Sequence, residues 1–160
     1  MFRAGDHEVW IGLTKPMDLC GDDTLCRQKG WNWEDGSTYN SAAFHRWYST
    51  YNSTNNNTWT HSTQDKVEEK TYLCARLYQS KWYERPCLGN GNNTFPCACE
   101  KRVVTSESGC PFGEKKHRHG CYSMKSKLMS YQECEESCKK DKGGIISIAN
   151  QKEQEFVAHL

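Results

Sequence analysis

The segment Trp31-Asn32-Trp33-Glu34-Asp35-Gly36 places two tryptophans at alternate positions of a short extended stretch. Side chains alternate between the two faces of a strand, so Trp31 and Trp33 are predicted to share one face. Asp35-Gly36 is a typical turn pair and predicts the end of the segment. Upstream, Glu8-Val9-Trp10-Ile11-Gly12-Leu13 has the short apolar run of a buried strand. These two segments predict a core built around a small sheet.

The cysteine content indicates the class of protein. Ten cysteines in 160 residues point to an oxidising compartment, where disulfides supplement a core that 36% apolar residues leave small. The 21 basic and 20 acidic residues nearly cancel, which argues against nucleic-acid binding and polybasic membrane contact. No run approaches the roughly 18 apolar residues of a membrane span. The first residues have no apolar signal-peptide core, so we expect a piece of a longer secreted or membrane-anchored protein.

The stretch from residue 37 to residue 70 is long, polar and rich in asparagine, serine and threonine. Loops of this length in compact domains are usually functional or disordered, so its position favours it as the ligand contact region. Its candidate anchors are Phe44, Trp47 and Trp59. N-x-[ST] sequons occur at Asn52, Asn56 and Asn92. Together with the cysteines, they predict glycosylation on surface loops.

Further extended segments follow this loop. Residues 72–77 and 81–84 are predicted to pair as strands, and residues 95–101 form another extended segment. Cys110 to Cys121 frames a basic hairpin, and residues 145–148 have the apolar character of a short buried strand.

Two helices are predicted in the last third of the chain. Ser130 and Glu133 have the spacing of a capping box, and Gly143-Gly144 is expected to end the helix that they begin. Asn150 with Glu153 caps a second helix. The apolar face of this second helix is formed by Phe156, Val157 and Leu160.

These motifs resemble segments of the C-type lectin-like domain. Trp10-Ile11-Gly12-Leu13 resembles the family's W-I-G-L strand, and residues 31–36 resemble its W-x-W-x-D-G. The family's three late cysteines, the last in C-E-K, are matched by Cys74, Cys87 and Cys99-Glu100-Lys101. The hairpin, the two helices and the Gly-Gly-Ile-Ile-Ser-Ile of residues 143–148 resemble the start of the domain. The resemblance implies a disulfide-rich α+β fold with two helices, short antiparallel sheets and a long recognition loop.

The order of the motifs departs from that of one intact family domain. Residues 1–101 resemble the C-terminal two thirds of the domain, and residues 110–160 resemble its N-terminal third. Residues 102–109 are typical of a linker. We therefore expect a cut through a tandem array, in which the end of one domain precedes the start of the next. The alternative is one circularly permuted domain, because the second segment followed by the first would complete it.

All ten cysteines can be paired within this interpretation. Cys134 and Cys138 are i and i+4 on a helix, and Cys97 and Cys99 are i and i+2 on a strand, so two parallel bridges are geometrically allowed. The resemblance implies that Cys138 bonds to a C-E-K cysteine such as Cys99, and we extend it to Cys134 with Cys97. In an array, these bridges would reach residues outside this chain. The other expected pairs are Cys20–Cys26, Cys74–Cys87 and Cys110–Cys121.

The resemblance also implies a calcium-dependent sugar site, most of whose residues are changed here. Calcium prefers about six to eight oxygen ligands, which the family draws from E-P-N or Q-P-D, a Glu before the first late cysteine, and W-N-D. No such tripeptide exists here, Tyr72 stands two residues before Cys74, and W-N-D reads Trp82-Tyr83-Glu84. Glu84 is the one retained candidate calcium ligand, so no cofactor is predicted. A calcium site built from asparagines outside the family pattern stays an alternative.

Two other patterns have alternative interpretations. His117, His119 and Cys121 form an H-x-H-x-C run that suits zinc, but a solvated basic hairpin closed by a disulfide is favoured. The run of residues 115–119 also suits heparin-like polyanions, although a charged loop is more often simply solvated. No nucleophile–base constellation is recognisable, so the protein is predicted not to be an enzyme.

The sequence predicts an extracellular recognition module that binds a glycan or an extracellular protein and contacts neither nucleic acid nor membrane through this segment. One open class is a lectin, carbohydrate-binding by family. The other is a calcium-independent protein-binding module of a receptor or matrix adaptor, which the changed sugar-site residues favour. A structural spacer in an array is a third, weaker alternative.

Overall fold

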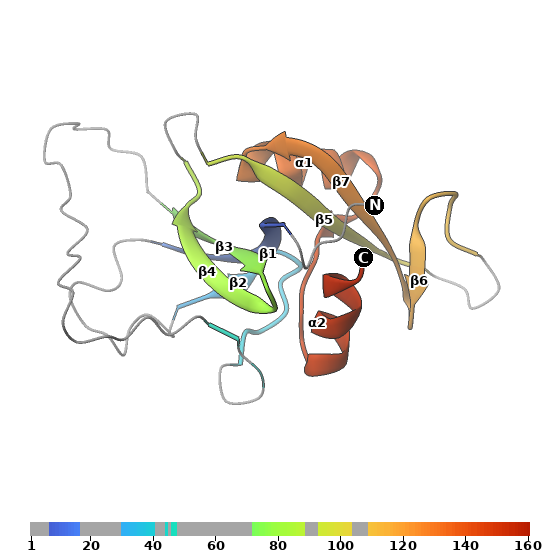
Figure 1. Cartoon of the computed structure of the whole chain (residues 1–160), viewed down its shortest axis with the longest axis horizontal. Helices are drawn as coiled ribbons and strands as arrows, with labels where there is room; N and C mark the ends of the chain where they lie inside the picture. Colours follow the sequence, from blue (N-terminus) through green and yellow to red (C-terminus); the bar gives the residue numbers. More distant parts are fainter. Residues whose placement is uncertain are drawn as a thin grey trace, which may run out of the picture.

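The computed structural model describes residues 7–16, 30–40, 44, 46–47, 72–88, 93–103 and 109–160. Within these ranges the strands are Val9–Pro16 (β1), Asn32–Trp33 (β2), Tyr72–Tyr78 (β3), Lys81–Pro86 (β4), Phe95–Arg102 (β5), Lys115–His117 (β6), Gly120–Met129 (β7) and Gly144–Ile145 (β8). The helices are Tyr131–Lys140 (α1) and Gln151–Ala158 (α2) (Figure 1). The expected α+β class is confirmed.

The described strands form one mixed sheet in the order β4-β3-β1-β5-β7-β6, with β2 on β1 and β8 on β5. Paired strands are antiparallel except β1 and β5, which run parallel with Trp10 opposite Cys97. Strand β8 is shorter than the predicted 145–148 because Ile146 bonds to two different strands. Its N–H donates to the Ala98 carbonyl at 3.0 Å, and its carbonyl accepts from the Gly12 N–H at 2.8 Å.

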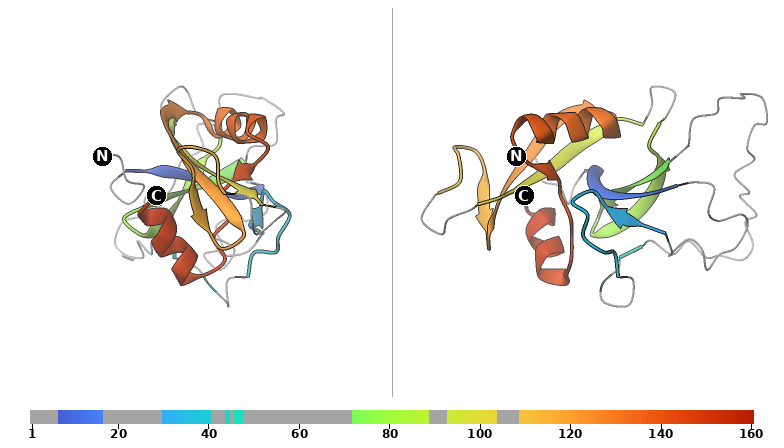
Figure 2. Two further views of the ribbon diagram at one scale, coloured as in Figure 1. Left: turned by 90° about the vertical axis from the view of Figure 1, so that its right-hand side faces the viewer. Right: turned by 180° about the vertical axis from the view of Figure 1, so that it is seen from behind.

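The two segments that the motif order separates lie in this same sheet. Strand β5 pairs with β7 from Phe95–Met129 at one end to Arg102–Gly120 at the other. Strand β8, in the turn region after α1, adds to β5 through Cys99–Ile145 and Glu100–Gly144. Figure 2 shows α1 lying along β5 and β7, with α2 on the other side of these strands. Residues 109–160 therefore complete the sheet that residues 7–103 begin.

Strand β1 is buried on both faces, which explains its continuous apolar sequence. Val9, Ile11 and Leu13 enter one core cluster, which also contains Val157 of α2. Trp10 points into a second cluster, which contains cysteines of α1 and β5. Gly12 is required between them because a Cβ there would lie 2.8 Å from the Ile145 carbonyl oxygen. The two helices thus cover opposite faces of the strand that the W-I-G-L motif forms.

Both helices begin where the sequence predicts. The Ser130 side chain accepts from the Glu133 N–H in a complete capping box, and the Asn150 side chain accepts from the Glu153 N–H. Helix α1 ends at Lys140, and Lys142 takes the left-handed conformation (φ 62°) that glycine usually supplies. Gly143 has a different role, since a Cβ there would collide with the Glu100 carbonyl. Gly143 therefore serves the close contact with β5, and its N–H also donates to the Cys138 carbonyl at the helix end.

Candidate functional site

Glu84, the retained candidate calcium ligand, lies in β4 opposite Ala75 of β3 and is partly buried. Within the described residues, it belongs to no group of three or more acidic, histidine or cysteine side chains close enough to hold a metal. Tyr72, which stands where the family has a glutamate, is the exposed first residue of β3. The described part of this region therefore offers calcium one carboxylate.

Next to Glu84, Trp82 organises a group of rings. It is fully buried, and the rings of Trp33, Phe44 and Trp47 each lie 5.7 Å from it, near perpendicular. The Tyr39 ring lies 6.4 Å from it, and the Tyr39 hydroxyl accepts from Trp47 Nε1 at 2.8 Å. We call these five residues the aromatic cluster. Edge-to-face packing of this kind adds specific stabilisation to apolar burial, so the described start of the 37–70 stretch is fixed to β4.

Helix α2 is bonded to the same cluster. Trp82 Nε1 donates to Gln154 Oε1 at 2.8 Å, and the Gln154 amide donates to the Ser80 carbonyl at 2.5 Å. Gln154 is 1% exposed, so both of its bonds are shielded from water. Arg46 donates to Gln151 one turn earlier. The positions of β4 and of Arg46 are therefore fixed by hydrogen bonds to Gln151 and Gln154. Sequence analysis did not identify this role, because no local pattern predicts that Gln154 is buried.

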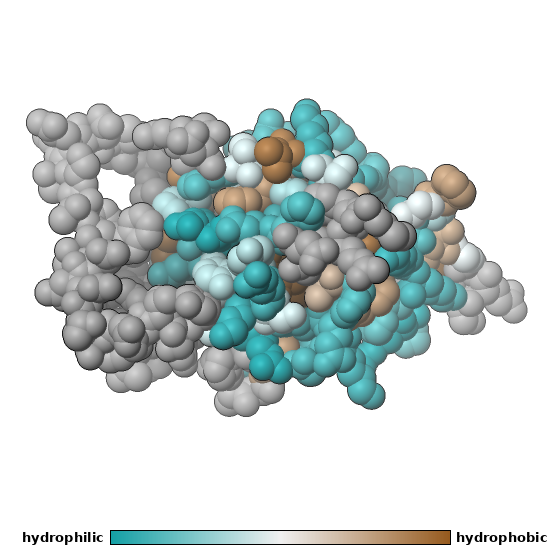
Figure 3. Space-filling model, viewed as in Figure 1, coloured by the Kyte–Doolittle hydropathy of each residue, from teal (hydrophilic) through white to brown (hydrophobic). Residues whose placement is uncertain are grey.

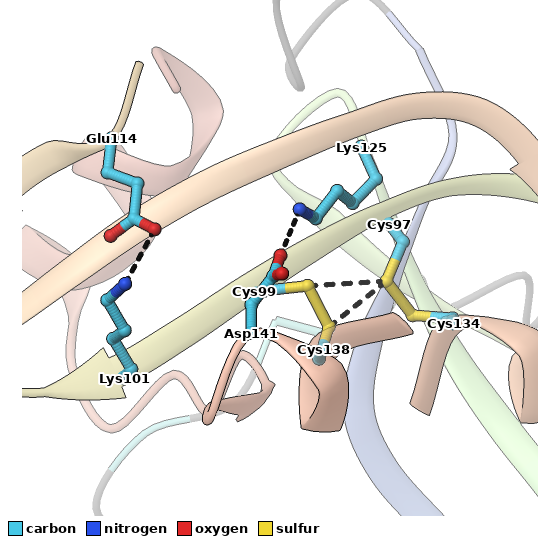
Figure 4. A network of polar contacts seen from close by, with 8 residues as sticks. All are labelled: Cys97, Cys99, Lys101, Glu114, Lys125, Cys134, Cys138 and Asp141. Carbon is cyan, nitrogen blue, oxygen red and sulfur yellow. Dashed lines mark hydrogen bonds and ion pairs between the residues drawn. A yellow bond between two sulfur atoms is a disulfide. The ribbon is translucent and has the colours of Figure 1, made fainter. Parts of the chain in front are cut away.

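The disulfides join the elements as expected for the residues described. The structure contains Cys74–Cys87, Cys97–Cys134, Cys99–Cys138 and Cys110–Cys121. Four of these cysteines, Cys97, Cys99, Cys134 and Cys138, meet between β5 and α1 and form what we call the disulfide cluster (Figure 4). The sulfurs of Cys97, Cys134 and Cys138 lie within 4.8 Å of one another. Because each is bonded in a disulfide, none provides the thiolate that a metal would need.

The H-x-H-x-C run does not converge on one point as a zinc site would. The His117 ring stacks on Phe156 of α2 at 4.3 Å, whereas His119 is exposed in the turn after β6. Cys121 is bonded to Cys110. Lys115, Lys116, Arg118 and His119 are exposed, and Lys115 Nζ also donates to the carbonyls of His159 and Leu160 at 2.8 and 2.9 Å.

A groove of about 750 Å³ opens between the end of β5, the β6–β7 turn and the turns around β8. Its lining includes Tyr122 and three carboxylates, Asp35, Glu100 and Glu153, and we call these four residues its floor. The Ser147 hydroxyl lies 2.7 Å from Glu100 Oε1 and 3.1 Å from Asp35 Oδ2. The Tyr122 hydroxyl donates to Glu153 at 3.5 Å. Sequence analysis did not identify this groove, because strand register brings together residues from four separate segments.

The carboxylates of the floor differ in their electrostatics. Burial raises the pKa of Glu100 above its ordinary value, although hydrogen bonds from Ser147 oppose the shift. For Asp35, burial acts in the same direction, but hydrogen bonds from Ser37 and Ser147 and the charge of Arg102 bring its pKa below the ordinary value. Burial and the charges of Glu100 and Glu153 raise the pKa of Tyr122. The floor therefore combines an ionised carboxylate, a buried carboxyl group that resists ionisation and a phenol that stays protonated.

The remaining predicted site residues lie outside the described residues. They are Cys20, Cys26, Trp59 and the three sequon asparagines Asn52, Asn56 and Asn92. Most of the 37–70 stretch also lies outside the described residues. The exposed large apolar side chains of the described residues lie on separate segments, and they are Tyr72, Leu88, Phe112 and Leu128. The described surface in Figure 3 is mainly hydrophilic.

Comparison with known proteins agrees with this architecture. C-type mannose receptor 2 of Homo sapiens is 26% identical over 162 residues, which cover 96% of this chain. The receptors of the same name from Mus musculus and Rattus norvegicus are each 24% identical over 96% of this chain. The chain spans 9% of the length of these relatives. No family model and no solved structure matches.

These relatives confirm the resemblance to C-type lectin-like proteins that the motifs indicate. The two helices, the mixed sheet and the four disulfides agree with the α+β fold expected of that family. Among the described residues, no helix is long and apolar enough to cross a membrane.

Proposed function

We propose that this C-type lectin-like chain is an extracellular recognition module whose ligand contact is carried by the 37–70 stretch, which begins from the aromatic cluster. The observation that carries this proposal is the match, over 96% of the chain, to proteins named as receptors. Their name supports binding rather than catalysis. The four disulfides support an extracellular location, because disulfides persist in oxidising compartments.

We propose further that the module binds its ligand, a glycan or an extracellular protein, without the calcium chemistry of the family. Glu84 supports this, since among the described residues it belongs to no close group of three or more potential metal ligands, while calcium needs several oxygen ligands together. The aromatic cluster supplies another kind of support. It fixes Phe44 and Trp47 against β4, so the loop that follows starts from a rigid base. Glycosylation at Asn52, Asn56 and Asn92 stays a prediction.

The division into residues 1–101, 102–109 and 110–160 also stays a proposal. The order of the motifs supports a tandem array, and one continuous match to a much longer receptor runs through both segments in that order. The pairing of β5 with β7 suits either arrangement. In an array, each segment would pair with the corresponding segment of its own domain, which lies outside this chain. In a permuted domain, the two segments of this chain pair with each other.

The test is binding of the oxidised chain to panels of glycans and extracellular matrix proteins, in calcium and in EDTA. We expect binding that survives EDTA and the Glu84→Ala substitution. Glu135→Ala, in α1 and partly buried like Glu84, is the matched control for loss of one carboxylate. Binding that disappears both in EDTA and in Glu84→Ala, but not in Glu135→Ala, would replace this proposal with calcium-dependent recognition.

A further inference from the structure

The rim of the groove carries three exposed basic side chains beside its three carboxylates. Arg102 lies at the end of β5 opposite Gly120, Arg118 lies in the β6–β7 turn, and Lys142 lies in the turn after α1. All three are exposed, and none belongs to an ion pair among the described residues. By contrast, the neighbouring Lys101 is paired with Glu114 at 2.8 Å. Three elements therefore bring basic side chains to one groove, where they face the carboxylates of Asp35, Glu100 and Glu153 across its lining.

Two of these basic residues have an unusual backbone. Arg118 (φ 49°) and Lys142 (φ 62°) are in the left-handed region, which glycine and asparagine adopt at lower cost than long side chains do. Left-handed non-glycine residues are often retained at binding sites, where the side chain is needed at that position. Here both line the same groove. Their conformation thus agrees with a role for the two charges themselves.

The floor offers acceptors rather than further positive charge. Asp35 accepts from Ser37, and Glu153 accepts from the Ala149 N–H at 2.9 Å, so both are held in fixed orientations. Each carboxylate accepts more than one hydrogen bond, so these groups can also accept from a ligand hydroxyl. A polyanion without hydroxyl groups could not donate hydrogen bonds to the carboxylates and would only be repelled by them. A neutral sugar would leave the rim charges unused.

The geometry points to a sulfated oligosaccharide as the occupant of this groove. Its sulfates pair with Arg102, Arg118 and Lys142, because sulfate accepts charge-assisted hydrogen bonds from such cations. Its ring hydroxyls donate to the carboxylates of the floor. This site goes beyond the proposed recognition function, since it uses neither Glu84 nor the aromatic cluster. It is a second contact site, on the side of β5 that faces the hairpin.

The test measures binding of a heparin-derived octasaccharide to the intact oxidised chain by calorimetry, in EDTA and at physiological salt. The groove variant combines Arg118→Asn and Lys142→Asn, because asparagine tolerates the left-handed backbone and removes the charge. The matched control combines Lys127→Gln and Lys152→Gln, two exposed lysines outside the groove. We expect the groove variant to bind about tenfold or more weakly, and the control to stay within about twofold of the wild type.

Two further ligands test the chemical class. The desulfated octasaccharide and a polyglutamate of matched charge are both expected to bind about tenfold or more weakly than the sulfated octasaccharide. The proposal is overturned if the wild type does not bind the octasaccharide, or if groove and control variants lose equal affinity. Equal binding of polyglutamate or of the desulfated sugar also overturns it. Any of these results leaves the proposed function intact, because that test depends on Glu84 and on a separate ligand panel.

Discussion

The disulfide cluster and the aromatic cluster hold opposite faces of the sheet by different means. In the first, two covalent bonds join β5 to α1, and Trp10 packs beside them with its Nε1 donating to the Met129 carbonyl at 2.9 Å. In the second, Trp82 connects β4, the loop base and α2 through ring packing and one buried hydrogen bond. Disulfides stabilise a fold mainly by lowering the conformational entropy of the unfolded chain, whereas ring packing stabilises the folded state directly. The two faces should therefore respond differently to substitution.

Trp82→Ala is expected to have the largest effect. Removing a fully buried tryptophan leaves a cavity and an unpaired Gln154 acceptor, so the free energy of unfolding should fall by about 3–5 kcal/mol. Urea denaturation followed by circular dichroism measures this. Trp47→Ala is the comparison within the cluster, because Trp47 is only partly buried and should cost less. Equal losses in the two variants would mean that Trp82 is not the centre of the cluster.

Removal of one disulfide is expected to come next. Replacing Cys97 and Cys134 by alanine should lower the free energy of unfolding by about 2 kcal/mol, the low end for a disulfide, because Cys99–Cys138 already closes nearly the same loop of the unfolded chain. The other bond, Cys99–Cys138, still holds α1 on β5. Peptide mapping without reductant accompanies the measurement. If Cys138 of the variant forms a bond with any cysteine other than Cys99, the two bridges do not form independently.

Glu100→Gln is expected to have the smallest effect. Glu100 lies on β5 and lines the groove, so this variant tests the groove side of β5 without changing the disulfide cluster. Because the pKa of Glu100 is raised in the folded protein, its contribution is present below the ordinary value of 4.5 and is lost as pH rises through the folded pKa. The variant should therefore gain stability relative to the wild type as pH rises above 4.5. Glutamine retains an acceptor for Ser147. Thermal melts across this range measure the difference.

Asp35→Asn is the control of opposite sign. The pKa of Asp35 is lowered, so its contribution is present above the ordinary value of 3.8 and is lost as pH falls through the folded pKa. The deficit of this variant should shrink in acid. A pH-independent difference for both variants would show that the two carboxyl groups do not contribute through their ionisation.

Local signals in the sequence predict much of this fold. The capping residues Ser130 and Asn150 interact within their own helix turn, so their spacing alone identifies both helix starts. The periods of a strand and a helix allow two bridges between β5 and α1, and the family resemblance implies which cysteines they join. The groove and the buried Gln154 could not be predicted in this way. They depend on the register of β5 with β7 and on the contact of α2 with β4. No short stretch of the sequence predicts either of these long-range contacts.

The two bonds of the disulfide cluster interleave along the chain, in the order Cys97, Cys99, Cys134, Cys138. A protease that cleaves once anywhere between Glu100 and Glu133 would therefore release no fragment, because both bonds span the cut. The nicked molecule would run as one species on a non-reducing gel and as two after reduction. Cleavage within residues 102–109 would thus break the main chain without releasing residues 110–160 from strand β5.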